Sequence, residues 1–172
     1  TLRDRERPGG TVIRSLDDKT PRVHPTAFVS EAAYVIGDVE IGEGSSVWPG
    51  VVIRADMGTI KIGKNTCIQD NSVVHGDADV AIGDRVVIGH GVLCHARTVG
   101  DGSLLGSGST VNDGADIGES SLVAAGAVVL ENMEIPPRSL VAGVPARIRG
   151  QVAERHLELM NSTCQSYIDK TQ

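Results

Sequence analysis

The chain has very few aromatic side chains: one Trp, one Phe and two Tyr among 172 residues, or 2%. Large rings supply much of the buried area of a conventional layered core, so this composition argues against such a core. The cysteines Cys67, Cys94 and Cys164 are odd in number and widely spaced. This pattern is not that of a disulfide framework, and it favours a reduced, cytoplasmic protein.

The chain also lacks a basic segment, and its formal net charge is −6. Without a basic stripe we expect neither a nucleic-acid partner nor binding to an anionic membrane. No apolar run is long enough to span a bilayer, and the N-terminal TLRDRERPGG lacks the apolar stretch of a signal peptide. The length fits a single domain.

What the chain has instead is an aliphatic residue at every sixth position, commonly followed by glycine. A helix repeats at about 3.6 residues and a strand at about two, so neither explains a period of six. A coil of three short strands does, with Gly, Asn or Asp at each corner. With three breaks in register, the inward positions are Val23, Val29, Val35, Ile41, Val47, Ile53, Ile62, Ile68, Val74, Ile82, Ile88, Cys94, Val99, Leu105, Val111, Ile117, Val123 and Val129, and Ile135 and Val141 add a partial coil.

Three hexads per coil predict an all-β triangular prism of about six to seven coils, with rungs about 4.8 Å apart. The repeat resembles that of the hexapeptide-repeat family, whose fold is a left-handed parallel β-helix. The left-handed sense comes from this resemblance, because ordinary crossover connections are right-handed. The alternative is a β-sandwich, which would not need so many matched hexads.

The prism is expected to be flanked by two short segments. We expect residues 1–22 to be an irregular lead-in, residues 23–148 to form the β-helix, and residues 149–172 to form a C-terminal helix packed on the prism. Within 151–170 apolar residues recur at helical spacing, which simple packing explains. This stripe comprises Ala153, Leu157, Met160, Cys164 and Ile168 or Tyr167.

Three histidines lie in the middle of the repeat. A residue that follows an inward position points outward, so His75 and His95 should lie one rung apart on the third face of the prism. Arg54 occupies the same column one coil earlier. His90 falls near a corner of the second face, and Asp70, one coil earlier, should be stacked against it.

These positions predict a metal site shared between chains. Zinc binds imidazole nitrogens at about 2.0–2.1 Å, so its ligands must converge. His75 and His95 can meet one ion, whereas His90 of the same prism points away and His90 of an adjacent prism can complete the site. A cyclic homotrimer is a small ring that closes in this way. Three imidazoles leave one position open, as a catalytic Zn²⁺ requires, and Fe²⁺ or Co²⁺ suits the same donors.

The alternative is that all three are ordinary surface histidines, the class to which we assign His24 and His156.

The segments VWPGVVIRADMGTIKIGKNTCIQDNSVVH and IGDRVVIGHGVLCHARTVGDGSLLGSGSTVNDGADIG resemble the gamma class of carbonic anhydrases. The most discriminating part is the series Arg-x-Asp, Ile-Gln-Asp, His and Gly-His-(x)₄-His, whereas AGVPAR is shared with hexapeptide acyltransferases. The resemblance implies metal-dependent, reversible hydration of CO₂ to bicarbonate by metal-bound hydroxide at a trimer interface. It implies that His75, His90 and His95 are the ligands.

The same resemblance implies roles for five further residues. Arg54 and Asp56 match an Arg-Gly-Asp element that forms an inter-subunit ion pair. Gln69 matches the residue that hydrogen-bonds the metal-bound solvent, and Asp70 matches its companion near the interface. Tyr167 resembles the C-terminal active-site tyrosine of the family.

Three departures from the family pattern leave the activity open. The short GDADVA replaces a long acidic loop that carries a proton-shuttle glutamate, and Asp77 and Asp79 are either substitutes or turn residues. Met57 stands where the family often has Glu, and Cys67 where it often has Asn. A proton must leave the metal-bound water in each turnover, so a missing relay slows or abolishes hydration.

Two other functions remain open. The first is a hexapeptide acyl- or acetyltransferase or an acyl-CoA thioesterase, which would use one histidine as a base and no metal. The second is a non-catalytic, metal-binding relative of the gamma carbonic anhydrases.

Overall fold

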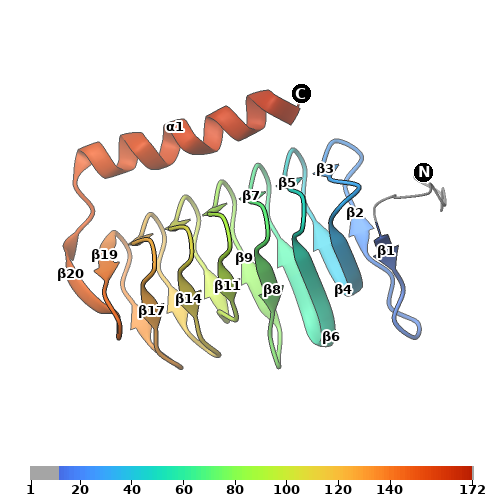
Figure 1. Cartoon of the computed structure of the whole chain (residues 1–172), viewed down its shortest axis with the longest axis horizontal. Coiled ribbons are helices and arrows are strands. Elements are labelled where there is room, and N and C mark those ends of the chain that lie inside the picture. The colour runs from blue at the N-terminus through green and yellow to red at the C-terminus, as the bar shows by residue number, and fades with distance from the viewer. Residues whose placement is uncertain (1–11, 172) are drawn as a thin grey trace.

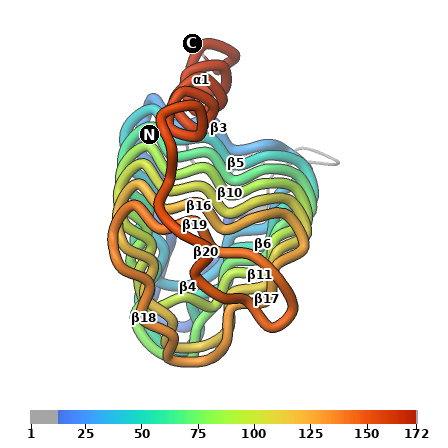
Figure 2. The backbone as a smooth tube through the Cα atoms, turned by 90° about the vertical axis from the view of Figure 1, so that its left-hand side faces the viewer, coloured from blue at the N-terminus to red at the C-terminus, as the bar shows by residue number. Residues whose placement is uncertain are grey.

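The computed structural model of the chain describes residues 12–171. They form a three-sided parallel β-solenoid of about seven turns, followed by one helix that runs along the prism (Figure 1). The coils superimpose when the solenoid is viewed end-on, and the helix lies outside the face that contains β5 (Ser46–Val47) and β10 (Val87–Ile88) (Figure 2). The prediction of a left-handed parallel β-helix with a C-terminal helix is confirmed. No helix within 12–171 is both long and apolar enough to cross a bilayer.

Three sets of short strands form the faces, and two long strands join two of the faces. The first face contains β2 (Arg22–Val23), β9 (Val80–Ile82), β12 (Thr98–Val99), β15 (Asp116–Ile117) and β18 (Glu134–Ile135). The second contains β3 (Phe28–Val29), β5 (Ser46–Val47), β7 (Cys67–Ile68), β10 (Val87–Ile88), β13 (Leu104–Leu105), β16 (Leu122–Val123), β19 (Ser139–Ala142) and β20 (Arg147–Gln151). The third contains β1 (Val12–Arg14), β8 (Val73–His75), β11 (Leu93–Cys94), β14 (Thr110–Val111) and β17 (Val128–Val129). The long strands β4 (Tyr34–Ile41) and β6 (Val52–Ile62) continue from the third face into the first.

The interior is a stack of aliphatic side chains, as the period of six predicts. From Val35 to Val141 every predicted inward position is at most 3% exposed, while Val23 and Val29 in the first coil are half-buried. Each rung pairs in parallel register with the next, as in Ile68 with Ile88 and Ile88 with Leu105. The narrow interior therefore takes one small aliphatic residue per strand, which explains why the chain needs so few aromatic rings.

Both ends of the chain differ in part from the sequence-based expectation. Residues 12–14 form β1, which pairs in parallel with β4, so regular structure begins inside the expected irregular lead-in 1–22. Residues 1–11 lie outside the described part. At the other end β20 pairs antiparallel with β19, and α1 (Glu154–Thr171) begins only after it. The expected helical segment 149–172 is therefore partly a strand.

Helix α1 covers the second face. Met160, Cys164 and Ile168 are buried, and the helix packs against β5, β7 and β10. The Cys164 thiol also donates to the Asn65 carbonyl at 3.3 Å. Ala153 precedes the helix and is exposed, so the prediction that it belongs to the apolar stripe of the helix is wrong.

Alkylation is expected to leave all three cysteines intact in the folded protein. Burial raises the pKa of the Cys67 thiol to about 12 and that of Cys94 to about 11, and it also raises the pKa of Cys164. The thiolate is the reactive form and an ordinary thiol has a pKa of about 8.5, so near pH 8 the reactive fraction of Cys67 falls by about a thousandfold. Mass spectrometry after iodoacetamide should show no adduct on folded protein and adducts on all three cysteines in denaturant. Rapid labelling of the folded protein would contradict this burial.

Candidate metal centre

Strands β8 and β11 place His75 and His95 side by side on the third face. Their strands pair in register, and the two imidazole centroids are 4.9 Å apart with an interplanar angle of 68°. His75 is 7% exposed and His95 is half-buried. Two rings at this separation are close enough to share one metal ion at nitrogen distances of about 2.0–2.1 Å.

His90 lies apart from this pair, in the turn that follows β10 on the second face. Its side chain is about half exposed, and its Nδ1 lies 3.0 Å from the Asp70 carboxylate. Within residues 12–171 no three His, Cys, Asp or Glu side chains are grouped so that they could hold a metal ion. One chain therefore presents a pair and a separate third imidazole, as the repeat register predicts.

Each of these histidines is hydrogen-bonded to a carboxylate about one coil away. The pairs are His75 with Asp56, His90 with Asp70 and His95 with Asp113, at nitrogen–oxygen distances of 2.8, 3.0 and 2.9 Å. An ionised carboxylate only accepts hydrogen bonds, so each ring nitrogen is the donor. Ring orientation by a carboxylate is the usual support of a metal-binding histidine, so this donor set fits a divalent ion such as Zn²⁺.

Two of the three contacts use one ring nitrogen and the third uses the other. His90 and His95 donate from Nδ1, which leaves Nε2 free as a ligand, whereas His75 donates from Nε2 to Asp56. His75 would therefore bind a metal through Nδ1 or exchange its bond to Asp56 for the metal.

Arg54 and Asp56 project to the same side of β6 because only Ala55 separates them. The Arg54 guanidinium donates to Asp56, and Arg54 lies in register beside His75. The hydrogen bond from His75 is the main reason that the pKa of Asp56 is lowered, and the Arg54 charge adds to it. Asp56 thus stays ionised and accepts from both neighbours.

Gly37 makes this arrangement possible. It lies opposite Ala55 in the β4–β6 pair, at a shift in the strand register, and has a φ of +88°. A Cβ atom at this position would overlap the Ala55 carbonyl. The close approach of β4 and β6 at Arg54–Asp56 therefore requires glycine at position 37, a requirement that the period of six does not reveal.

Gln69 and Tyr167 lie on the second face with His90 and Asp70. Gln69 is 5% exposed, and its amide nitrogen is 3.9 Å from the Cys67 sulfur. Tyr167 of α1 packs edge-on against Trp48 with centroids 5.1 Å apart. Burial raises the Tyr167 pKa, and the nearby Cys67 and Asp70 raise it further. Within one chain these residues are thus grouped with His90 rather than with His75 and His95.

The short GDADVA segment is a bend at residues 77–78 that leads directly into β9. Asp79 accepts the Thr59 backbone N–H at 2.8 Å, which favours the turn role over that of a proton relay. Asp77 is exposed, and Met57 is 67% exposed.

Asp113 is a neighbour of the candidate site that sequence reasoning missed. It lies in the corner after β14, where Asp-Gly is typical of a turn, so nothing local separates it from the other corner residues. Its contact with His95 crosses from one coil to the next, and only the assembled prism shows it.

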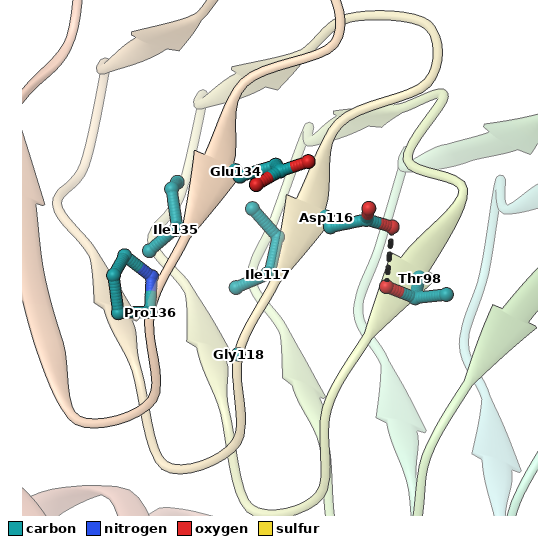
Figure 3. A pocket seen from close by; sticks show the side chains of 7 residues that line it. All are labelled: Thr98, Asp116, Ile117, Gly118, Glu134, Ile135 and Pro136. Carbon is teal, nitrogen blue, oxygen red and sulfur yellow. Dashed lines mark hydrogen bonds between the residues drawn. The ribbon is translucent and has the colours of Figure 1, made fainter.

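The first face carries a separate feature, a shallow depression of about 300 Å³ along β12, β15 and β18. The Asp116 and Glu134 carboxylates lie on adjacent rungs, and Thr98 donates to Asp116 at 2.7 Å (Figure 3). Arg97 also pairs with Asp116, and this pair lowers the Asp116 pKa. No histidine lines this depression, so it is distinct from the candidate metal centre.

Comparison with solved structures defines the class of this protein. A hexapeptide transferase family protein from Anaplasma phagocytophilum superimposes with a TM-score of 0.89 at 36% identity, covering 93% of this chain and 96% of that one. A putative acetyltransferase from Bacillus cereus gives 0.87 at 31% identity, covering 94% and 95%. The chain is a hexapeptide-repeat β-helix protein.

Sequence relatives narrow the class to one family. A probable carbonic anhydrase from Methanocaldococcus jannaschii is 44% identical over 142 residues, which are 81% of this chain and 89% of the relative. Gamma carbonic anhydrase 1, mitochondrial, from Arabidopsis thaliana is 39% identical over 168 residues, 93% of this chain and 61% of that protein. The chain belongs to the gamma carbonic anhydrase family.

This chain spans about three fifths of the length of the Arabidopsis relatives that it matches. A search of protein-family models finds no match. The Arabidopsis relative is named as a mitochondrial protein, so the cytoplasmic location expected from the sequence stays a prediction.

Proposed function

We propose that this chain catalyses the reversible hydration of CO₂ to bicarbonate at a metal ion held between the subunits of a homotrimer. The observation that carries the proposal is the His75–His95 pair on the third face, with His90 of the same chain held apart on the second. The family relation supports the reaction. When bound, Zn²⁺ would supply an acidified water, since zinc lowers the pKa of bound water from 15.7 to about 7 in the known example of carbonic anhydrase.

Two faces, from neighbouring chains, would each supply part of the metal site. One chain provides His75 and His95 from its third face, supported by Asp56 and Asp113. The neighbour provides the second-face corner, which holds His90 and Gln69 together. The Gln69 amide has both a donor and an acceptor, so it suits the orientation of water and of a bicarbonate oxygen.

An apolar column beside the histidines supports contact between copies. Tyr34, Val52, Val73 and Leu93 pair rung by rung on the third face, and Tyr34 and Leu93 are each 39% exposed. A contiguous exposed apolar stripe next to a polar site is typical of a protein–protein interface. Burial of this column in a trimer would bring the second face of a neighbour close to the histidine pair.

The proposal is tested on protein purified without chelator, by metal analysis and stopped-flow CO₂ hydration. We expect about one metal ion per chain, since a trimer with three interfaces has three sites, and hydration that disappears when the metal is removed. The control is His24→Ala, because His24 bonds to Thr26 near β2 on the first face. Metal-free protein from metal-supplemented medium would refute the site.

A second candidate function is acyl transfer or acyl-CoA hydrolysis. It is favoured by the structural likeness to a putative acetyltransferase at 31% identity and a TM-score of 0.87. The same preparation is therefore assayed for thiol release from acetyl-CoA. Thiol release that survives metal removal would support this function over hydration.

The exposed Met57 and the short GDADVA turn favour a third outcome, a metal-binding relative without catalytic activity. Bound metal with neither hydration nor thiol release would support it.

A further inference from the structure

The His95 ring is hydrogen-bonded to the Asp113 carboxylate. Its Nδ1 donates to the Asp113 Oδ1 at 2.9 Å. The His95 ring also packs edge-on against the His75 ring, with centroids 4.9 Å apart. Asp56 and Asp70, which support the other two histidines, belong to motifs that the family resemblance already implicates. Asp113 belongs to none of these motifs.

The fold fixes the backbone that carries Asp113. Its carbonyl accepts the Asn132 N–H at 2.9 Å from the next coil, and the preceding Asn112 side chain donates to the Val129 carbonyl at 2.7 Å. Gly114, which follows, has a φ of +70° and completes the corner. With its backbone anchored to the following coil, Asp113 directs its carboxylate back towards the preceding one, where His95 lies.

A carboxylate in this position selects one form of the imidazole. Because ionised Asp113 can only accept, the neutral His95 ring must carry its proton on Nδ1, and the Nε2 lone pair is left free. Because the acceptor is charged, the hydrogen bond from His95 to Asp113 is stronger than a hydrogen bond to a neutral group. This bond therefore opposes rotation of the His95 ring. Without Asp113 the ring would be free to change both tautomer and orientation.

We propose that Asp113 is a positioning residue that holds His95 in the Nδ1–H form with Nε2 available to the shared metal ion. The metal-binding part of this inference rests on the proposed function. The positioning part concerns the metal-free chain and is tested independently.

The test compares Asp113→Leu, Asp113→Asn and the surface control Glu134→Gln, which removes a carboxylate from the first face. Nitrogen NMR of metal-free protein reports the His95 tautomer, with the signal assigned by His95→Gln. Chelator competition then measures the affinity for Zn²⁺, and the absorption spectrum of the Co²⁺ form reports ligand geometry.

We expect Asp113→Leu to lose the Nδ1–H tautomer, to bind Zn²⁺ about 10- to 100-fold more weakly and to alter the Co²⁺ spectrum. Asp113→Asn keeps a carbonyl acceptor of the same size, so it should retain the tautomer and most of the affinity. Glu134→Gln should match the wild type in every measurement.

Two results would overturn the inference. The first is the wild-type His95 tautomer in Asp113→Leu. The second is an equal loss of the tautomer and of Zn²⁺ affinity in Asp113→Asn and Asp113→Leu, which would mean that residue 113 acts through the backbone of the corner. If wild-type protein binds no metal, the proposed function fails. If in that case the His95 tautomer still depends on Asp113, the result supports the positioning of His95 by Asp113 but not metal binding.

Discussion

Two inactive variants, co-expressed, are expected to recover about one third of wild-type CO₂ hydration in the mixed trimers. The variants are His90→Ala and the double variant His75→Ala/His95→Ala. Each site would take its histidine pair from one chain and His90 from the next, so a trimer that contains both variants has one complete site of three. Measurement is by stopped-flow hydration on purified heteromers that carry two different affinity tags.

Each variant expressed alone should lose more than about 100-fold in activity, because the loss of a hydrogen-bonded support of a ligand already costs about 10- to 100-fold in metal affinity or activity. Mixing the separately assembled proteins under conditions that prevent subunit exchange is the control and should restore nothing. Co-expressed heteromers without recovered activity would show that the pair and His90 do not meet across an interface.

Gly37→Ala is expected to cost about 2–5 kcal/mol of unfolding free energy. A side chain in the left-handed backbone region costs about 1–2 kcal/mol, and the overlap with the Ala55 carbonyl adds a packing strain of about 1–3 kcal/mol. For a domain of this size 1 kcal/mol shifts the melting temperature by about 2–4 °C. Calorimetry should therefore show a loss of roughly 4–20 °C.

Gly126→Ala is the matched control for this effect. Gly126 has a φ of +67° but open space around its Cβ direction, so the substitution carries only the backbone strain of about 1–2 kcal/mol. Equal destabilisation by the two substitutions would mean that β4 and β6 tolerate separation at Ala55. In that case the position of Asp56 would not depend on Gly37.

The repeat made most of the fold predictable. Because one residue in six must fill a narrow interior, the inward positions from Val35 to Val141 could be identified from their spacing, and all are buried. The ends were harder. The β1 strand interrupts the expected irregular lead-in, and β20 turns back antiparallel along β19, because pairing with an existing rung stabilises segments that have no hexad of their own.

The candidate site, like the fold, was predictable only in part. Register along the repeat predicted that His75 and His95 would be neighbours and that His90 would lie by Asp70, and the structure places them so. Register did not predict Asp113, because a corner residue can reach the coil before it, the coil after it or solvent. The choice depends on how the corner backbone is anchored.

The sequence by itself determined which residues line the interior and which residues share a column, since both follow from a period of six wrapped on three faces. Only the tertiary structure decided that His75 and His95, like His90, each have a carboxylate partner, and which ring nitrogen each carboxylate holds. These contacts join side chains about 18–20 residues apart, across coils whose spacing and corner geometry exist only after the prism has assembled.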